Sequence, residues 1–145
     1  MTAFADTSAV VKLYVDEPGA DVVRSLGTMY VSALTGVEVA SALWRKHRQA
    51  ELAAESVQQF ASWFDDDIHA TDRRLVRLDL DQAQLDHAAL LVSQHDLRAS
   101  DAIQLAAALA VRRADPTCDR FACFDQALMA AAKAEGFGDA QSDSC

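Results

Sequence analysis

The sequence predicts an α/β fold in which a mostly parallel sheet is covered by helices on both faces. Short apolar runs alternate with helical stretches along all 145 residues, a length that suits one domain. Strands joined by helical crossovers pair in parallel, and such sheets are buried on both faces. Right-handed crossovers leave few topologies, and ligands bind at the carboxyl ends of the strands.

The first half of the chain is expected to contain two short strands and four helices. Strands are expected at residues 3–5 and 29–31, and helices at about 8–15, 20–26, 37–48 and 52–64. Pro18 and Gly19 separate the first two helices, because this dipeptide favours a turn. The later two follow from apolar side chains at helical spacing, such as Val37 and Trp44.

The second half is expected to contain two more strands and three helices. Strands are expected at residues 75–80 and 121–124, and helices at about 81–94, 100–113 and 126–135. The alternating pattern of residues 75–80 is typical of a strand, and the alanine-rich run at 100–113 favours a helix. Gly136 ends the last helix. The domain is therefore expected to span residues 1–137, with no final strand and a flexible tail over 138–145.

Composition narrows the class of protein. The formal net charge of −9 is unusual for a generic nucleic-acid-binding protein but suits one that concentrates carboxylates around hard cations. Local basic clusters at residues 45–48, 73–77 and 112–113 are typical of solvated helix faces and ends.

Several other classes of protein are not expected. No apolar run is long enough to cross a bilayer, and the first eleven residues lack the basic start of a signal peptide. The odd set of cysteines, at 118, 123 and 145, argues against a disulfide framework and for the reducing cytoplasm. The four histidines have no ligand spacing, so a structural zinc site is not expected.

Four acidic residues stand at informative positions, although each has a local explanation. Asp6 and Asp125 follow strands and precede helices, as N-cap residues do. Glu38 lies three residues after Thr35, the spacing of a capping box. Asp101 lies in the first turn of a helix, where the helix dipole favours a negative charge.

Taken together, the four acids predict a metal site. Asp6 and Asp125 should lie at the same edge of one parallel sheet, and Glu38 follows the second strand closely enough to approach that edge. Carboxylates about 4 Å apart repel one another by roughly 4 kcal/mol per pair at an effective dielectric constant near 20. A protein that gathers four must protonate some or bind divalent cations, which prefer oxygen ligands.

Four segments of the chain resemble, in order, the acidic motifs of VapC-type PIN-domain toxins. They are residues 4–14 (FADTSAVVKLY), 34–42 (LTGVEVASA), 97–106 (LRASDAIQLA) and 121–128 (FACFDQAL). The resemblance implies a three-layer α/β/α sandwich with a central parallel sheet. It also implies Mg²⁺- or Mn²⁺-dependent cleavage of RNA by water, often of tRNA or ribosomal RNA, a homodimer, and a neutralising antitoxin.

The resemblance assigns roles to individual residues. It implies that Asp6, Glu38, Asp101 and Asp125 bind the catalytic metal. It further implies hydroxyl contacts near the metal from Thr7 and Ser8, although these side chains equally suit hydrogen bonding at a helix N-terminus. Arg98 is expected near the site, contacting phosphate, with pairing to Asp96 as the alternative. Gln104 stands where the family often has histidine or glutamine and discriminates little.

Two rival interpretations remain open at the level of sequence. One is a catalytically silent PIN-like module that binds RNA or an antitoxin without cleaving RNA. The other is a different acid-dependent α/β protein, either a phosphotransfer receiver or a haloacid-type phosphatase. The phosphatase needs a second aspartate two residues after the first, where this chain has Ser8. The receiver needs an acidic pair after the first strand and a lysine after a late one, and neither is clear.

Overall fold

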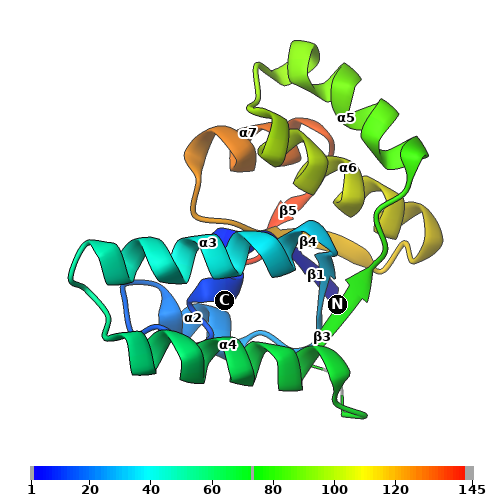
Figure 1. Ribbon diagram of the computed structural model, residues 1–145. Helices are drawn as coiled ribbons and strands as arrows, with labels where there is room; N and C mark the ends of the chain where they lie inside the picture. Colours follow the sequence, from blue (N-terminus) through cyan, green and yellow to red (C-terminus); the bar gives the residue numbers. More distant parts are fainter. Residues whose placement is uncertain (1, 73, 143–145) are drawn as a thin grey trace.

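The computed structural model describes residues 2–72 and 74–142, which fold around one five-stranded parallel sheet (Figure 1). The order of the strands is β3-β2-β1-β4-β5, so the N-terminal strand lies at the centre. The strands are β1 (Thr2–Ala5), β2 (Met29–Ser32), β3 (Leu75–Leu78), β4 (Cys118–Ala122) and β5 (Gly138–Asp139). Every pairing is parallel. All strands therefore present their carboxyl ends at the same edge of the sheet.

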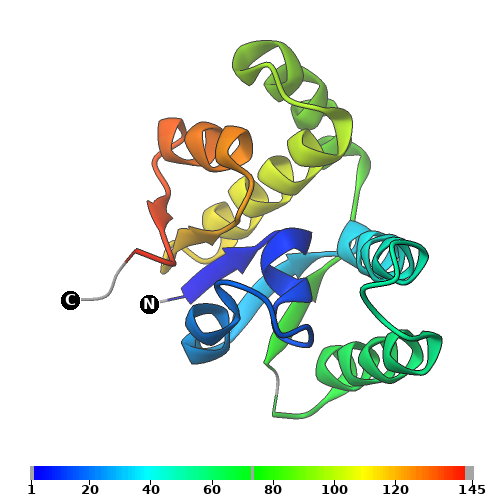
Figure 2. The same ribbon diagram turned by 90° about the vertical axis from the view of Figure 1, so that its left-hand side faces the viewer.

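Seven helices connect these strands in the described part of the chain. They are α1 (Thr7–Val11), α2 (Ala20–Ser25), α3 (Leu34–Arg48), α4 (Ala54–His69), α5 (Gln82–His95), α6 (Ala99–Ala114) and α7 (Gln126–Ala134). Helices α1 to α4 cover one face of the sheet, and α5, α6 and α7 cover the other (Figures 1 and 2). The predicted three-layer α/β/α sandwich with a parallel sheet is therefore confirmed.

The alternation of side chains along the central strands divides the core into two layers. Phe4 of β1 faces the α6 side, where its ring stacks on Phe121 of β4 with ring centroids 5.6 Å apart. Its neighbours Ala3 and Ala5 face the opposite layer, together with Val10 of α1. Because both faces of the sheet are buried, the strands consist of apolar runs, as expected for a parallel sheet.

The C-terminal end of the fold differs from the sequence prediction. We expected no final strand, yet Gly138–Asp139 pairs with β4 as the edge strand β5, and Ala140 after it is buried. A domain that ended at residue 137, as the sequence suggested, would therefore lack the edge strand β5 of its own sheet. The part of the expected flexible tail at residues 143–145 lies outside the described residues.

Other expected elements are present with shifted ends. Strand β4 ends at Ala122, two residues earlier than expected, so Cys123 and Phe124 lie beyond the strand. The first helix is shorter than expected and ends at Val11. Cys118 and Cys123 are free and buried, and Cys145 lies outside the described residues. Within the described ranges, none of the helices combines the length and apolar character needed to cross a membrane.

Candidate active site

A cavity of about 380 Å³ opens at the carboxyl ends of the strands, and all four predicted acids line it. Asp6 follows β1, Asp125 follows β4, Glu38 lies in the second turn of α3, and Asp101 lies in the first turn of α6. The fold thus brings together residues that are up to 119 positions apart in the chain. The expectation that the acids share one edge of the sheet agrees with this arrangement.

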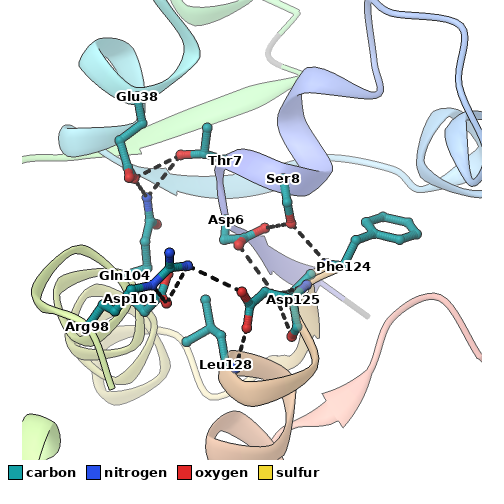
Figure 3. A network of polar contacts seen from close by, with 11 residues as sticks. Asp6, Thr7, Ser8, Glu38, Arg98, Asp101, Gln104, Phe124, Asp125 and Leu128 are labelled. Atoms are coloured by element: carbon teal, nitrogen blue, oxygen red, sulfur yellow. Dashed lines mark hydrogen bonds and ion pairs between the residues drawn. The ribbon is translucent and has the colours of Figure 1, made fainter. Parts of the chain in front are cut away.

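Asp6 is the most buried of the four acids, with 5% of its surface exposed. Its Oδ1 atom accepts hydrogen bonds from the Ala9 amide (3.1 Å) and the Ser8 hydroxyl (2.6 Å). The Ser8 oxygen in turn accepts a bond from the Phe124 amide (2.9 Å), next to Asp125 (Figure 3). Asp6 therefore does cap α1, as its sequence position suggested, and it also lines the cavity.

Glu38 is held by side chains from two other helices. Its Oε1 atom accepts hydrogen bonds from the Thr7 hydroxyl (2.9 Å) and from Nε2 of Gln104 (2.7 Å). Gln104 is almost completely buried, and Nε2 also donates to the Thr35 hydroxyl (3.0 Å). The capping-box interpretation of Thr35 and Glu38 is therefore wrong, because Thr35 lies inside α3 and Glu38 bonds across to α1 and α6 (Figure 3).

Asp101 and Asp125 are joined by Arg98. Nη2 of Arg98 lies 3.3 Å from Oδ2 of Asp101 and 3.4 Å from Oδ2 of Asp125. The other oxygen of Asp125, Oδ1, caps α7 by accepting a bond from the Leu128 amide (2.9 Å). Arg98 is thus at the site, as expected, and the alternative of pairing with Asp96 is not what the structure shows.

Burial and mutual repulsion act on the acids at this site. Burial raises the pKa of Asp6 to about 6, against hydrogen bonds from Ser8, Ala9 and Cys123, and the negative charge of Asp101 adds to the rise. Burial also raises the pKa of Asp101, while Arg98 opposes the rise and the charges of Asp125 and Glu38 reinforce it. Burial is therefore the main cause of both raised pKa values, and the neighbouring carboxylates add to it.

The donor atoms of this cavity fit a hard divalent cation. They are carboxylate oxygens, with hydroxyls beside them, and such ligands suit Mg²⁺ and Mn²⁺. The acids are nevertheless more widely spread than we expected. Within residues 2–72 and 74–142, no three His, Cys, Asp or Glu side chains lie close enough together to hold one metal ion. In this arrangement the guanidinium of Arg98 supplies the positive charge between Asp101 and Asp125.

Several residues at the site were not singled out from the sequence. Gln104 was recognised in its motif but given no role, and its contacts with Glu38 and Thr35 become visible only in the fold. Lys12 also lines the cavity, beside Lys46 of the basic cluster that the sequence did indicate, and Glu17 joins the two lysines through contacts of 2.9 and 2.8 Å. Glu17 follows closely after the first motif, residues 4–14, and this position in the sequence could have singled it out.

The Cys123 thiol is a further buried group at the site. It lies 3.4 Å from Oδ2 of Asp6 and accepts a hydrogen bond from the Asp125 amide (3.3 Å). Burial raises its pKa, with the charge of Asp6 adding to the rise, so the thiol stays protonated and suits packing more than nucleophilic chemistry. Cys123 therefore links the carboxylate of Asp6 to the backbone of Asp125.

Comparison with protein families matches the PIN domain over residues 3–114 of this chain. No curated protein sequence matches it. Solved structures with a similar fold include a toxin–antitoxin complex from Klebsiella pneumoniae, at 18% identity and a TM-score of 0.56, covering 85% of this chain and 86% of that one.

Two further structures share the fold. VapC20 of Mycobacterium tuberculosis, described as a Sarcin-Ricin loop cleaving toxin, is 16% identical with a TM-score of 0.65, covering 96% of this chain and 98% of that one. PAE2754 from Pyrobaculum aerophilum is 19% identical with a TM-score of 0.57, covering 98% and 94%. The family match extends over the first three of the four acids, and the chain belongs to the PIN domain family.

Proposed function

We propose that this protein is a Mg²⁺- or Mn²⁺-dependent endoribonuclease that acts as the toxin of a toxin–antitoxin pair. The observation that supports the proposal most is that the four predicted acids, from four separate segments, line one cavity. A structural role does not require this convergence, because each acid could serve its own helix end at a separate surface. PIN domains are typically nucleases and generally use divalent metals, which agrees with the chemistry of these donors.

In this proposal, Asp6, Glu38, Asp101 and Asp125 hold the cation. The chemistry that such a cation supplies is a water of lowered pKa and stabilisation of the leaving oxygen as the phosphodiester bond is hydrolysed. Ser8 and Thr7 orient the carboxylates of Asp6 and Glu38 through their hydroxyl groups. The residues thus contribute placement and electrostatics, and no side chain is needed as a covalent nucleophile.

An RNA strand can be held by the cations of the same cavity. Lys12, at the end of α1, lines the cavity together with Arg45 and Lys46 of α3, and Arg98 contacts two of the acids. Contacts of this kind bind the phosphate backbone and carry no sequence information. The RNA target, whether tRNA or ribosomal RNA, therefore depends on shape and on bases outside the cavity.

We further propose a cognate antitoxin and a homodimer as partners, with the cytoplasm as the place of action. The fold is shared with a protein in a toxin–antitoxin complex, which supports an antitoxin partner. Light scattering of the purified protein tests the dimer. Co-expression with the product of the neighbouring gene tests whether cleavage is suppressed by a bound protein.

The decisive experiment compares Asp6→Asn with Asp81→Asn in RNA cleavage with Mg²⁺ or Mn²⁺. Both aspartates cap helices, Asp6 through Ala9 and Asp81 through Gln84, but only Asp6 lines the cavity. Asparagine keeps the capping oxygen, so both variants should fold. We expect Asp6→Asn to abolish cleavage and Asp81→Asn to cleave at the wild-type rate. Sequencing RNA ends after induction of each variant then identifies the cut sites.

The same comparison separates an enzyme from a silent binding module. A silent module binds RNA or antitoxin but shows no metal-dependent cleavage in the wild-type protein. Cleavage by Asp6→Asn at the wild-type rate would also contradict the proposal, because the activity would then come from another site or from a contaminant. Calorimetric titration of Mn²⁺ into the wild-type protein gives an independent measure of metal binding.

A further inference from the structure

Arg98 contacts two of the four acids through the oxygens that they have available. Of the two Asp125 oxygens, Oδ1 accepts the Leu128 amide at the start of α7, and Oδ2 contacts Nη2 of Arg98. Oδ2 of Asp101 contacts both Nε and Nη2 of the same guanidinium, each at 3.3 Å. A divalent cation that uses Oδ2 of Asp125 therefore has to replace an existing ion pair.

Among the described residues, the other cations that line the cavity do not bridge two of the four acids. Lys12 and Lys46 both contact Glu17, and Lys46 also contacts Glu51, so both lysines form ion pairs away from the four acids. Arg45 lines the cavity but forms no ion pair within the described ranges. Among the described residues that line the cavity, Arg98 is thus the cation that bridges predicted metal ligands (Figure 3).

The Arg98 side chain is free to leave this position without disturbing the fold. Its backbone is fixed as the N-cap of α6, where its carbonyl accepts a bond from the Ala102 amide (3.0 Å). Its side chain is 77% exposed. The side chains of Asp101 and Asp125 are 15% and 33% exposed, so these are partly exposed ion pairs, in which water competes for the guanidinium. The guanidinium can therefore move out while α6 and Asp101 keep their places.

We propose that Arg98 is a built-in counter-ion that competes with the divalent cation for Asp101 and Asp125. The inference relies on the proposed function, since it takes these two acids as metal ligands. When the cation is absent, Arg98 bridges the two carboxylates and reduces their repulsion. When the cation is bound, Arg98 is released and its guanidinium becomes available to a phosphate of the substrate.

The proposal predicts opposite effects of Arg98 on metal and on RNA. Arg98→Gln should bind Mn²⁺ about threefold to tenfold more tightly, the range that corresponds to removing one or two partly exposed ion pairs. The same variant should bind RNA more weakly, since it lacks one phosphate contact. A residue with a merely structural role would weaken both kinds of binding when replaced.

Calorimetric titration of Mn²⁺ at low ionic strength provides the test, with Arg45→Gln as the matched control. Both substitutions remove one positive charge from the cavity, but only Arg98 contacts the acids. We expect Arg45→Gln to change Mn²⁺ affinity less than twofold. A second measurement, thermal unfolding with and without Mn²⁺, should show a larger metal-induced stabilisation for Arg98→Gln than for the wild type, by mass action.

Two results would overturn the inference while leaving the proposed function intact. One is unchanged or weaker Mn²⁺ binding by Arg98→Gln in a protein that still binds Mn²⁺ and cleaves RNA as the wild type. The other is an equal gain in affinity from Arg45→Gln, which would assign the effect to overall charge. If neither the wild type nor Arg98→Gln binds Mn²⁺, the inference and the proposed function fail together.

Discussion

Asp6 combines two local roles, because one carboxylate oxygen caps α1 while the buried carboxyl group lines the cavity. A sequence shows the cap position but not the burial, which depends on β4 and Cys123 from the far end of the chain. The interpretation of Asp6 as a helix cap and its interpretation as a site residue are therefore compatible. The same holds for Asp125 at α7.

The raised pKa of Asp6 predicts a pH-dependent loss of stability in the metal-free protein. The folded pKa of about 6 exceeds the ordinary value of 3.8, so the folded state favours the protonated carboxyl. The associated stability is fully present below about pH 4 and is lost as the pH rises through 6. Two pKa units correspond to about 3 kcal/mol at most. We expect Asp6→Asn, which stays neutral, to escape this loss.

Chemical denaturation in the presence of a chelator measures this effect. The wild type and Asp6→Asn share every other ionisable group. The difference between their unfolding free energies therefore isolates the contribution of Asp6. This difference should be small near pH 4 and should favour Asp6→Asn near pH 7. Parallel stability curves from pH 4 to 7 would show that Asp6 does not titrate as described.

Gln104 gives a second prediction at the residue scale. Replacing it with leucine removes a donor to Glu38, but it also removes the Oε1 atom, which is buried without a hydrogen-bond partner. These effects oppose each other, so we expect stability to fall by no more than about 1 kcal/mol. Losing the partner that orients a metal ligand typically costs about 10- to 100-fold in metal affinity or activity, and we expect a loss of that size.

A comparison of urea denaturation with RNA cleavage checks this separation of effects. If Gln104→Leu cleaves RNA at the wild-type rate, Gln104 does not orient Glu38 for catalysis. A large loss of stability, with activity falling in proportion, would indicate that Gln104 serves the core alone. The sequence could not have assigned the role, since Thr35 and Glu38 lie 69 and 66 positions away from Gln104 in the chain.

At the scale of elements, the sequence predicted the helices and the first four strands, β4 with shifted ends, but not the edge strand β5. Helices longer than three turns carry a periodic pattern, and α6 begins within one residue of its expected position. Strand β5 has only two residues, Gly138 and Asp139, which carry no alternation. It forms because β4 offers an unpaired edge, and that edge depends on tertiary structure rather than on local propensity.

Gln141, just beyond β5, should stabilise the end of β4. Its Oε1 atom accepts a hydrogen bond from the Cys123 amide (3.0 Å), and its Nε2 atom donates to the Cys123 carbonyl. Gln141→Ala leaves both groups without this partner, so we expect stability to fall by about 1–3 kcal/mol. Cleavage should fall too, because Asp125 lies two residues further along the chain.

Gln126→Ala is the matched control for Gln141→Ala. Gln126 lines the same hollow beside Cys123 but is exposed at the start of α7. Thermal and chemical denaturation should place this control within about 0.5 kcal/mol of the wild type. If the two alanine variants are equally stable, the contact between Gln141 and Cys123 contributes nothing measurable.

At the scale of the whole molecule, the net charge of −9 limits how the proposed RNA substrate can be bound. The cations that line the cavity are Lys12, Arg45, Lys46 and Arg98, and Glu17 already balances part of that charge. The affinity of a protein for single-stranded nucleic acid falls by about 0.7 of a log unit per log unit of salt for each phosphate that the protein neutralises. With four cations at most, we expect the slope of log affinity against log salt concentration to be no steeper than about −3.

Binding of fluorescent RNA by Asp6→Asn, the variant that we expect to be inactive, measures this slope in Mn²⁺ at several KCl concentrations. Arg45→Gln in the same background should make the slope shallower by about 0.7. A slope steeper than about −5 would mean that a second basic surface contacts the RNA, and Arg112 with Arg113 would be the first residues to test.

The central place of β1 also determines when the complete site can exist during synthesis. Strand β4 pairs directly with β1, and Asp125 follows β4. A nascent chain that has not yet emerged this far therefore has three of the acids, and one edge of β1 has no partner strand. Domains fold as units, and parallel sheets depend on contacts distant in sequence. A nascent chain on the ribosome therefore lacks the assembled site until Asp125 and β4 have emerged.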